Sequence, residues 1–149
     1  MSDQKRIYLD YAATTPMLDT ARQACMEGFQ NWANPSSPHA DGRMAQSILE
    51  NARARFKAAL DWDGEVIFTS CASEAIAIAI THSKPGRHVV SPVEHDAVLR
   101  LTEGAERIAV DLNGVVIPMK LNHMLKGEGG PALVIVQSVN NETGVMQDI

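Results

Sequence analysis

The sequence predicts an α/β protein with a mainly parallel sheet flanked by helices. Two stretches in the first part of the chain carry apolar residues at the 3.6-residue spacing of a helix. After them, short β-rich runs alternate with segments of helical length, an order that is typical of a parallel sheet. With 149 residues, 45% of them hydrophobic, the chain has apolar material for one core, so we expect one domain or a piece of one.

The two predicted helices span residues 19–33 and 43–60, and Pro, Ser and Gly residues between them break the pattern. Asp19 follows Pro16 and is placed to act as the N-cap of the first helix. The apolar positions of the second helix are Met44, Ile48, Ala52, Phe56 and Leu60. This longer pattern is typical of an amphipathic helix with one face on a core.

Four β-rich runs follow the helices and predict the strands of the sheet. They are EVIFTS (65–70), HVVS (88–91), RIAVD (107–111) and ALVIVQS (132–138). Asn113 and Gly114 stand between apolar flanks in DLNGVVI, a pair that favours a hairpin turn, so we expect one antiparallel excursion there.

The segment 74–80, EAIAIAI, is ambiguous because its alternation suggests a strand while its alanines favour a helix. The preceding FTSCAS ends a run in small residues, and Ser73 followed by Glu74 is a plausible helix start. We therefore expect a strand, a tight loop and a helix. Backbone N–H groups at such a helix start can hold a phosphate, although a cap that binds no ligand is the commoner arrangement.

Other polar residues follow the predicted strands, where parallel-sheet enzymes keep their sites. His95 comes after HVVS, and Asn140, Asn141, Glu142 and Thr143 come after ALVIVQ. A solvated loop histidine and ordinary asparagine turn chemistry explain each tract separately. Together with residues 70–73, these tracts could converge at one edge of the sheet.

Composition excludes several classes of function. A net charge of −5 with few aromatic residues argues against a nucleic-acid-binding protein. No run approaches the roughly 18 apolar residues needed to cross a bilayer, so we expect a cytoplasmic protein without a membrane partner. Cys25 and Cys71 lack disulfide-framework or metal-ligand spacing, so we expect reduced thiols and no metal site.

Five motifs, in order and over almost the whole chain, resemble the cysteine desulfurases. These are pyridoxal 5′-phosphate enzymes with the class V aminotransferase fold, which is the aspartate-aminotransferase-like fold type I. The motifs are YLDYAATTP, NPSSPHADGRMAQ followed by AR, FTSCASEA, EHDAV and NNETGVMQDI. The resemblance implies that residues 1–149 form the N-terminal part of the large domain, with a substrate-pocket segment at about residues 7–40.

The resemblance also implies roles for individual residues. CASE is similar to the phosphate loop of the family, so the backbone N–H groups of Ala72 and Ser73 and the Ser73 hydroxyl should hold the cofactor phosphate. His95 matches the histidine that stacks on the pyridine ring and assists proton transfer, and Asn141 matches the asparagine that bonds the ring hydroxyl. Three residues match segments bordering the substrate pocket: Ala13, Thr14 and Asn34.

The implied activity is the removal of sulfur from L-cysteine, which gives L-alanine and an enzyme persulfide for iron–sulfur cluster assembly or other sulfur delivery. The resemblance further implies a homodimer. Two departures fall in the phosphate loop, where Cys71 replaces glycine and Ser73 replaces threonine, and Ala77 stands where asparagine is common. Neither Cys25 nor Cys71 matches the persulfide cysteine of the family.

The sequence has no match for the later motifs of the family, which carry the cofactor-binding lysine, the pyridine-pairing aspartate and the catalytic cysteine. Lys84, in THSKPG, lacks the family's Ser-x-His-Lys order and falls at the predicted end of a helix. We therefore expect an N-terminal fragment that is inactive alone and binds the cofactor weakly or not at all.

Three alternatives remain open. The chain could be a non-catalytic module that associates with a missing C-terminal half or a sister subunit. It could belong to a selenocysteine lyase, because the deciding cysteine loop has no match here. A Rossmann-type nucleotide-binding domain is the weakest alternative, since the chain has no G-x-G-x-x-G motif.

Overall fold

The computed structural model describes residues 7–127 and 129–148, so Ile149, the last residue of the NNETGVMQDI motif, lies outside the described residues. The chain divides into two compact units, Met1–Phe68 and Thr69–Ile149, and each is treated by itself. None of the described helices is long and apolar enough to span a membrane.

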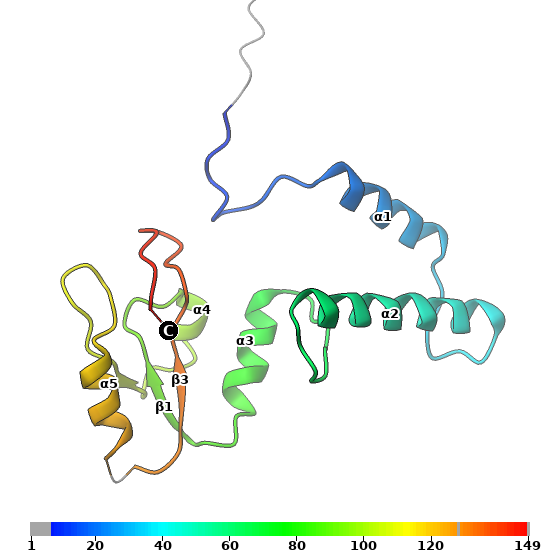
Figure 1. The fold of residues 1–149 in the computed structure, drawn as a ribbon. Helices are drawn as coiled ribbons and strands as arrows, with labels where there is room; N and C mark the ends of the chain where they lie inside the picture. The colour runs from blue at the N-terminus through cyan, green and yellow to red at the C-terminus, as the bar shows by residue number, and fades with distance from the viewer. Residues whose placement is uncertain (1–6, 128, 149) are drawn as a thin grey trace, which may run out of the picture. The chain divides into compact units, whose positions relative to one another are not determined.

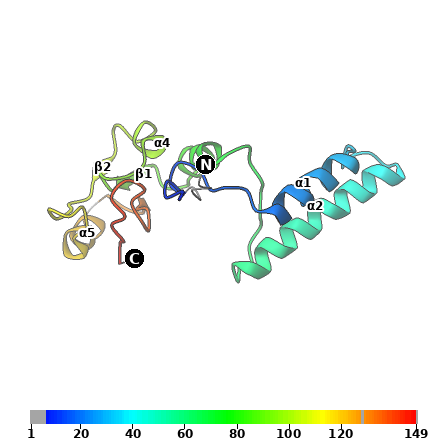
Figure 2. The ribbon, with the colours of Figure 1, turned by 90° about the horizontal axis from the view of Figure 1, so that it is seen from above.

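The first unit contains helices α1 (Asp19–Gln30) and α2 (Ala40–Ala59), which run in opposite directions (Figures 1 and 2). Both predicted helices are confirmed, although α1 ends earlier and α2 begins earlier than expected. The predicted Asp19 cap is wrong: Leu18 is the N-cap of α1 and makes no side-chain cap bond. Asp19 is instead the first helical residue, where it pairs with Arg22 at 3.1 Å.

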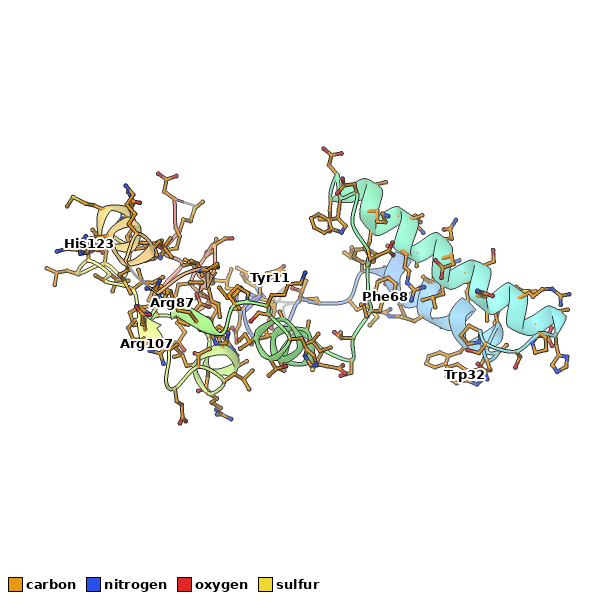
Figure 3. All side chains as sticks on the ribbon, turned by 90° about the horizontal axis from the view of Figure 1, so that it is seen from below. Tyr11, Trp32, Phe68, Arg87, Arg107 and His123 are labelled. Atoms are coloured by element: carbon orange, nitrogen blue, oxygen red, sulfur yellow. The ribbon has the colours of Figure 1, made fainter. Side chains whose placement is uncertain are left out.

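Most of the large apolar side chains of the first unit are exposed. None of its described hydrophobic residues is buried, and Figure 3 shows the ring of Trp32 projecting outward from the loop after α1. The apolar face that predicted α2 is also open, since Phe56 is 53% exposed. A periodic apolar pattern thus specified the helix without specifying what covers it.

The second unit is built on a three-stranded parallel sheet of order β2-β1-β3. The strands are β1 (Arg87–Val90), β2 (Glu106–Arg107) and β3 (Ala132–Ile135), and β1 pairs in parallel with both neighbours. The helices are α3 (Ala72–Thr81), α4 (Asp96–Leu99) and α5 (Pro118–Leu125). This order of elements confirms the α/β prediction.

Successive residues of β1 serve opposite faces of the sheet, as the strand repeat of two requires. Val90 packs with Ile80 of α3 and Val98 of α4. The cluster on the other face comprises Val89, Ile108 and Val116, with Leu121 and Met124 of α5 packed against it. The central strand is therefore buried by helices on both sides, and its two valines are fully buried.

One strand prediction is wrong. Residues 65–70 form no strand in the part of the chain that the structure describes, although their β-rich sequence favours one. A strand exists only when its N–H and C=O groups pair with a neighbour, and that pairing cannot be inferred from local sequence. The run 107–111 is a strand only in part, because β2 covers only Glu106–Arg107.

The predicted antiparallel excursion is confirmed by the isolated bridge between Val110 and Val116. The N–H of Asp111 donates to the carbonyl oxygen of Val115 at 2.9 Å, and Gly114 has a φ of +83° that favours glycine. The ambiguous segment 74–80 is helical, as predicted, within α3.

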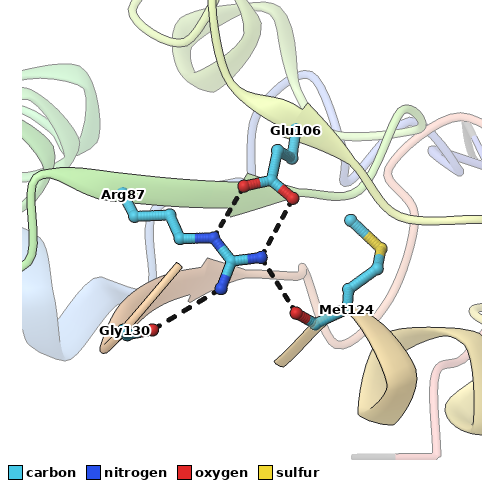
Figure 4. Close-up of polar contacts among 4 residues, drawn as sticks. All are labelled: Arg87, Glu106, Met124 and Gly130. Atoms are coloured by element: carbon cyan, nitrogen blue, oxygen red, sulfur yellow. Dashed lines mark hydrogen bonds and ion pairs between the residues drawn. The ribbon is translucent and has the colours of Figure 1, made fainter. Parts of the chain in front are cut away.

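A half-buried guanidinium ties the start of the sheet to the segments around it (Figure 4). Arg87 of β1 donates from Nε and Nη2 to the two carboxylate oxygens of Glu106 at 2.6 and 3.0 Å. Nη2 also donates to the carbonyl oxygen of Met124 at 2.9 Å. The Arg87 guanidinium bonded to its oxygens holds the pKa of the Glu106 carboxyl below its ordinary value of 4.5.

We expect Arg87→Met to lower the midpoint of thermal unfolding by several degrees, because it removes the two bonds to the Glu106 carboxylate and the bond to the Met124 carbonyl. The matched control is Arg100→Met, since the Arg100–Asp96 pair is exposed and contributes little. Calorimetry of both variants checks this, and equal shifts would contradict it.

The stability that the Arg87–Glu106 ion pair provides should also depend on pH. Because the pKa of Glu106 is lowered on folding, the contribution of this carboxylate to the free energy of unfolding is complete above about pH 4.5 and is lost as the pH falls through the lowered value.

Candidate functional site

The loops after β1 and β3 leave the sheet at the same edge. Val90 and Ile135 are paired in the ladder, and the N–H of Ser91 donates to the carbonyl oxygen of Ile135 at 3.0 Å. Because the strands are parallel, the segments that follow them, 91–95 and 136–143, begin side by side. Polar side chains at this edge lie where open α/β sheets bind ligands.

His95 is the N-cap of α4, and its ring is fixed from one side. Its Nδ1 accepts a hydrogen bond from the N–H of Ala97 at 3.1 Å. An accepting Nδ1 carries no proton, so the neutral ring carries its proton on Nε2. The residue is otherwise exposed, which leaves Nε2 available to a ligand.

Two hollows meet at His95. The first, called here the Asn141 hollow, has a volume of about 390 Å³. It is lined by Val93, Glu94, His95, Asp96, Leu99 and residues 140–143. The second, called here the Ser73 hollow, also has a volume of about 390 Å³. It is lined by Ser73, Ala77, His95, Asp96, Ala97, Arg100 and Leu101. The structure therefore brings His95 together with Ser73 on one side and with Asn141 on the other.

The two neighbouring asparagines differ in what their side chains do. Asn140 is half-buried, and both ends of its side-chain amide are hydrogen-bonded. Nδ2 donates to the carbonyl oxygen of Val93 at 2.9 Å, and Oδ1 accepts from the N–H groups of Glu142 and Thr143. Asn141 is exposed, and within the described ranges its side chain makes no hydrogen bond. Asn140 therefore shapes the loop, and Asn141 has its amide free for a ligand.

The N-terminus of α3 lies beside this site. The sequence predicts a helix start at Ser73, but the helix begins at Ala72 with Cys71 as N-cap. The N–H groups of Ala72 and Ser73 thus belong to the first turn, where no carbonyl of the same helix can accept from them. Glu74 accepts from the N–H of Ser70 at 2.6 Å, and this bond closes the loop that precedes the helix.

Cys71 fits its position without strain, because its φ of −163° is extended backbone that any residue adopts. The N–H of Glu74 and the hydroxyl of Ser70 lower the pKa of the exposed Cys71 thiol. Cys71 lines neither hollow. Lys84 follows the end of α3 and is exposed, and it too lines neither hollow.

The three residues predicted to border a substrate pocket lie in the first unit, and their described bonds stay there. The N–H of Ala13 donates to the Asp10 carboxylate at 3.3 Å. The carbonyl oxygen of Thr14 accepts from the hydroxyl of Tyr8 at 2.9 Å. The side chain of Asn34 accepts from the N–H of Ser36 at 2.9 Å. Each bond shapes a local turn.

Glu94 and Arg100 each line a hollow at His95, and neither was predicted as a site residue. Glu94 is only 8% exposed, and its position directly before His95 was the one available signal. Among the described residues, no group of three His, Cys, Asp or Glu side chains is arranged to hold a metal ion.

Residues 7–149 match the family model described as Aminotransferase class-V. Over 160 residues the chain is 34% identical to a putative cysteine desulfurase IscS 1 of Bacillus subtilis, covering 97% of this chain and 42% of that protein. It is 38% identical to a cysteine desulfurase of a Frankia species, covering 95% of this chain and 39% of the relative. The chain thus spans about two fifths of the length of these relatives.

Solved structures give the same result for the fold. A NifS-like protein from Rickettsia africae superimposes with a TM-score of 0.83 at 29% identity, over 95% of this chain and 42% of that one. A second NifS-like protein superimposes with a TM-score of 0.81 at 30% identity, over 97% and 43% of the two chains.

Proposed function

The chain belongs to the class-V aminotransferase family, and on that premise we propose that it is the N-terminal portion of a pyridoxal-phosphate-dependent cysteine desulfurase. The reaction takes sulfur from L-cysteine and leaves L-alanine and an enzyme persulfide. The relatives named above support this choice, since both carry that name over nearly the whole of this chain. The observation that carries the proposal is the position of His95 between the Ser73 and Asn141 hollows.

The residues present fit the cofactor at both of its ends. The first-turn N–H groups of Ala72 and Ser73, with the Ser73 hydroxyl, offer donors to a phosphate at the positive end of α3. The free amide of Asn141 offers a donor to the ring hydroxyl. His95 lines both hollows and offers a flat ring to stack on another ring.

When bound, pyridoxal phosphate supplies an electron-withdrawing ring that stabilises negative charge on the substrate. His95 orients that ring by stacking and moves a proton at Nε2, because its Nδ1 is held by Ala97. Ser73 and Ala72 fix the phosphate, and Asn141 fixes the opposite side. Ala13, Thr14 and Asn34 are proposed to border the substrate.

The proposed physiological setting follows the family. It comprises a homodimer, a role in iron–sulfur cluster assembly or other sulfur delivery, and the cytoplasm as location. Partners in this proposal are L-cysteine and the part of the protein that supplies the remaining catalytic groups. A selenocysteine substrate in place of L-cysteine is the alternative within the same chemistry.

Pyridoxal phosphate is expected to bind residues 1–149 weakly and without a covalent bond. Neither hollow is lined by a lysine, so the phosphate and ring contacts act alone. Asn141→Ala should weaken binding by roughly 2- to 10-fold, the range for one hydrogen bond. Equilibrium dialysis, followed by borohydride reduction and mass measurement, tests both statements.

Pyridoxal without its phosphate is the matched control ligand, and it should bind more weakly because it leaves Ala72 and Ser73 without an anion. Equal binding of the two ligands would argue against the phosphate assignment. A stoichiometric, borohydride-stable adduct on Lys84 would show that this lysine reaches the bound cofactor. It would overturn the assignment of Lys84 as a solvated residue.

The exposed apolar side chains of α1 and α2 favour a second candidate, a non-catalytic module that associates with a missing half or a sister subunit. Size-exclusion chromatography separates the candidates. A monomer whose elution is unchanged by an added C-terminal half would count against the module.

A further inference from the structure

Glu94 is a buried carboxylate that stands between the two loops of the candidate site. We propose that Glu94 is a positioning residue, which sets the separation of His95 and Asn141 through hydrogen bonds to the segment after β3. The inference rests on the proposed function, because it concerns how the two groups that hold the cofactor ring are kept in place.

Three side-chain bonds join the loop after β1 to the segment after β3. The Glu94 carboxylate accepts from the backbone N–H of Gln137, and the Gln137 side-chain amide donates to the carbonyl oxygen of Val93. The Asn140 side-chain amide donates to the same carbonyl at 2.9 Å. We call the side chains of Glu94, Gln137 and Asn140 the loop bridge.

In the described structure, no backbone-to-backbone hydrogen bond joins the two segments beyond Ser91 and Ile135. The parallel ladder ends at Val90 and Ile135, and the last backbone bond between the two segments runs from Ser91 to Ile135. Beyond it, the loops are held by the side chains of the loop bridge. The N–H of the half-buried Gln137 needs an acceptor, and the buried Glu94 carboxylate needs donors, so this bond serves both groups.

The loop bridge positions His95 and Asn141 because each is the next residue in sequence after a member of the bridge. His95 directly follows Glu94, and Asn141 directly follows Asn140, whose Oδ1 folds the turn by accepting from Glu142 and Thr143. Moving Glu94 away from Gln137 would change the distance between His95 and Asn141 across the Asn141 hollow. Groups that act on one ligand lose effect steeply when their separation changes by about 1 Å.

Two variants separate the reach of the Glu94 side chain from its charge. Glu94→Asp keeps the charge but is one methylene shorter, so we expect it to lose the bond to Gln137. Glu94→Gln keeps an acceptor oxygen at the same reach without the charge, so we expect it to retain the bond. Glu103→Ala, an exposed residue outside both hollows, is the control.

The experiment records two quantities by NMR on residues 1–149: hydrogen exchange of the Gln137 amide and the apparent Kd for pyridoxal 5′-phosphate from titration. For Glu94→Asp we expect faster exchange at Gln137 and roughly 10-fold weaker cofactor binding. Glu94→Gln and Glu103→Ala should match the parent within about 2-fold in both quantities. Retained protection of the Val89 and Val90 amides reports that the sheet is intact.

The outcomes are distinguishable from failure of the proposed function. Faster exchange at Gln137 with unchanged cofactor binding overturns the positioning role alone. Loss in Glu94→Gln equal to that in Glu94→Asp overturns it as well, because an acceptor oxygen at the original reach would then not be enough to hold the loops. If Glu94→Asp loses the protection of β1, Glu94 holds the sheet and not the loops, and the inference falls. A parent chain that shows no saturable cofactor binding counts against the proposed function itself.

Discussion

His95→Ala is expected to lower cysteine-dependent sulfide release by roughly 10²- to 10⁴-fold, the range for losing one acid–base group. The assay uses residues 1–149 together with the remaining part of the enzyme. His95 lines both hollows, and Ala97 holds its Nδ1 so that Nε2 is left for the reaction. The substitution therefore removes ring stacking and proton transfer together.

The matched control is His82→Ala. His82 is the exposed C-cap of α3 and lines neither hollow, so its loss should change the rate by no more than about 2-fold. Both variants are measured in the same assay. A His95→Ala enzyme as active as its parent would contradict the role assigned to this histidine.

Residues 1–149 alone are expected to release no sulfide from L-cysteine, even with added pyridoxal phosphate. Neither hollow is lined by a lysine or a cysteine, whereas the proposed reaction needs a lysine to hold the cofactor and a thiol to accept sulfur. Activity should return when a polypeptide carrying those groups is supplied. Sulfide release measured with and without that polypeptide checks this, and steady turnover by the isolated chain would contradict it.

Local sequence patterns predicted the helices well and the first strand badly. The 3.6-residue repeat in 43–60 depends only on near neighbours, so it could be detected in the sequence. A strand at 65–70 depends on a partner elsewhere in the fold, and the β-rich composition could not report whether that partner is present. The N-caps at Leu18 and Cys71 were each displaced from the predicted positions by one or two residues, because neither makes the side-chain bond that a cap signature assumes.

The candidate site was predictable where chain order alone determines it. His95 and Asn141 follow strands, and parallel strands deliver their following loops to one edge. The difference between Asn140 and Asn141 was not predictable from the pair of letters. It arises from a bond between Asn140 and Val93, which are 47 residues apart in sequence. The contact of Glu94 with Gln137 spans 43 residues and was missed for the same reason.

The most direct test of the central claim is an NMR titration of residues 1–149 with pyridoxal 5′-phosphate. We predict saturable shifts at the Ala72 and Ser73 amides, the His95 ring and the Asn141 side-chain amide, all with one Kd. In a separate titration with pyridoxal, which has no phosphate, the Ala72 and Ser73 amide signals should not shift. Shifts confined to another hollow, such as that lined by Ala52, Arg55, Phe56 and Ala59 on α2, would contradict a cofactor site at the sheet edge.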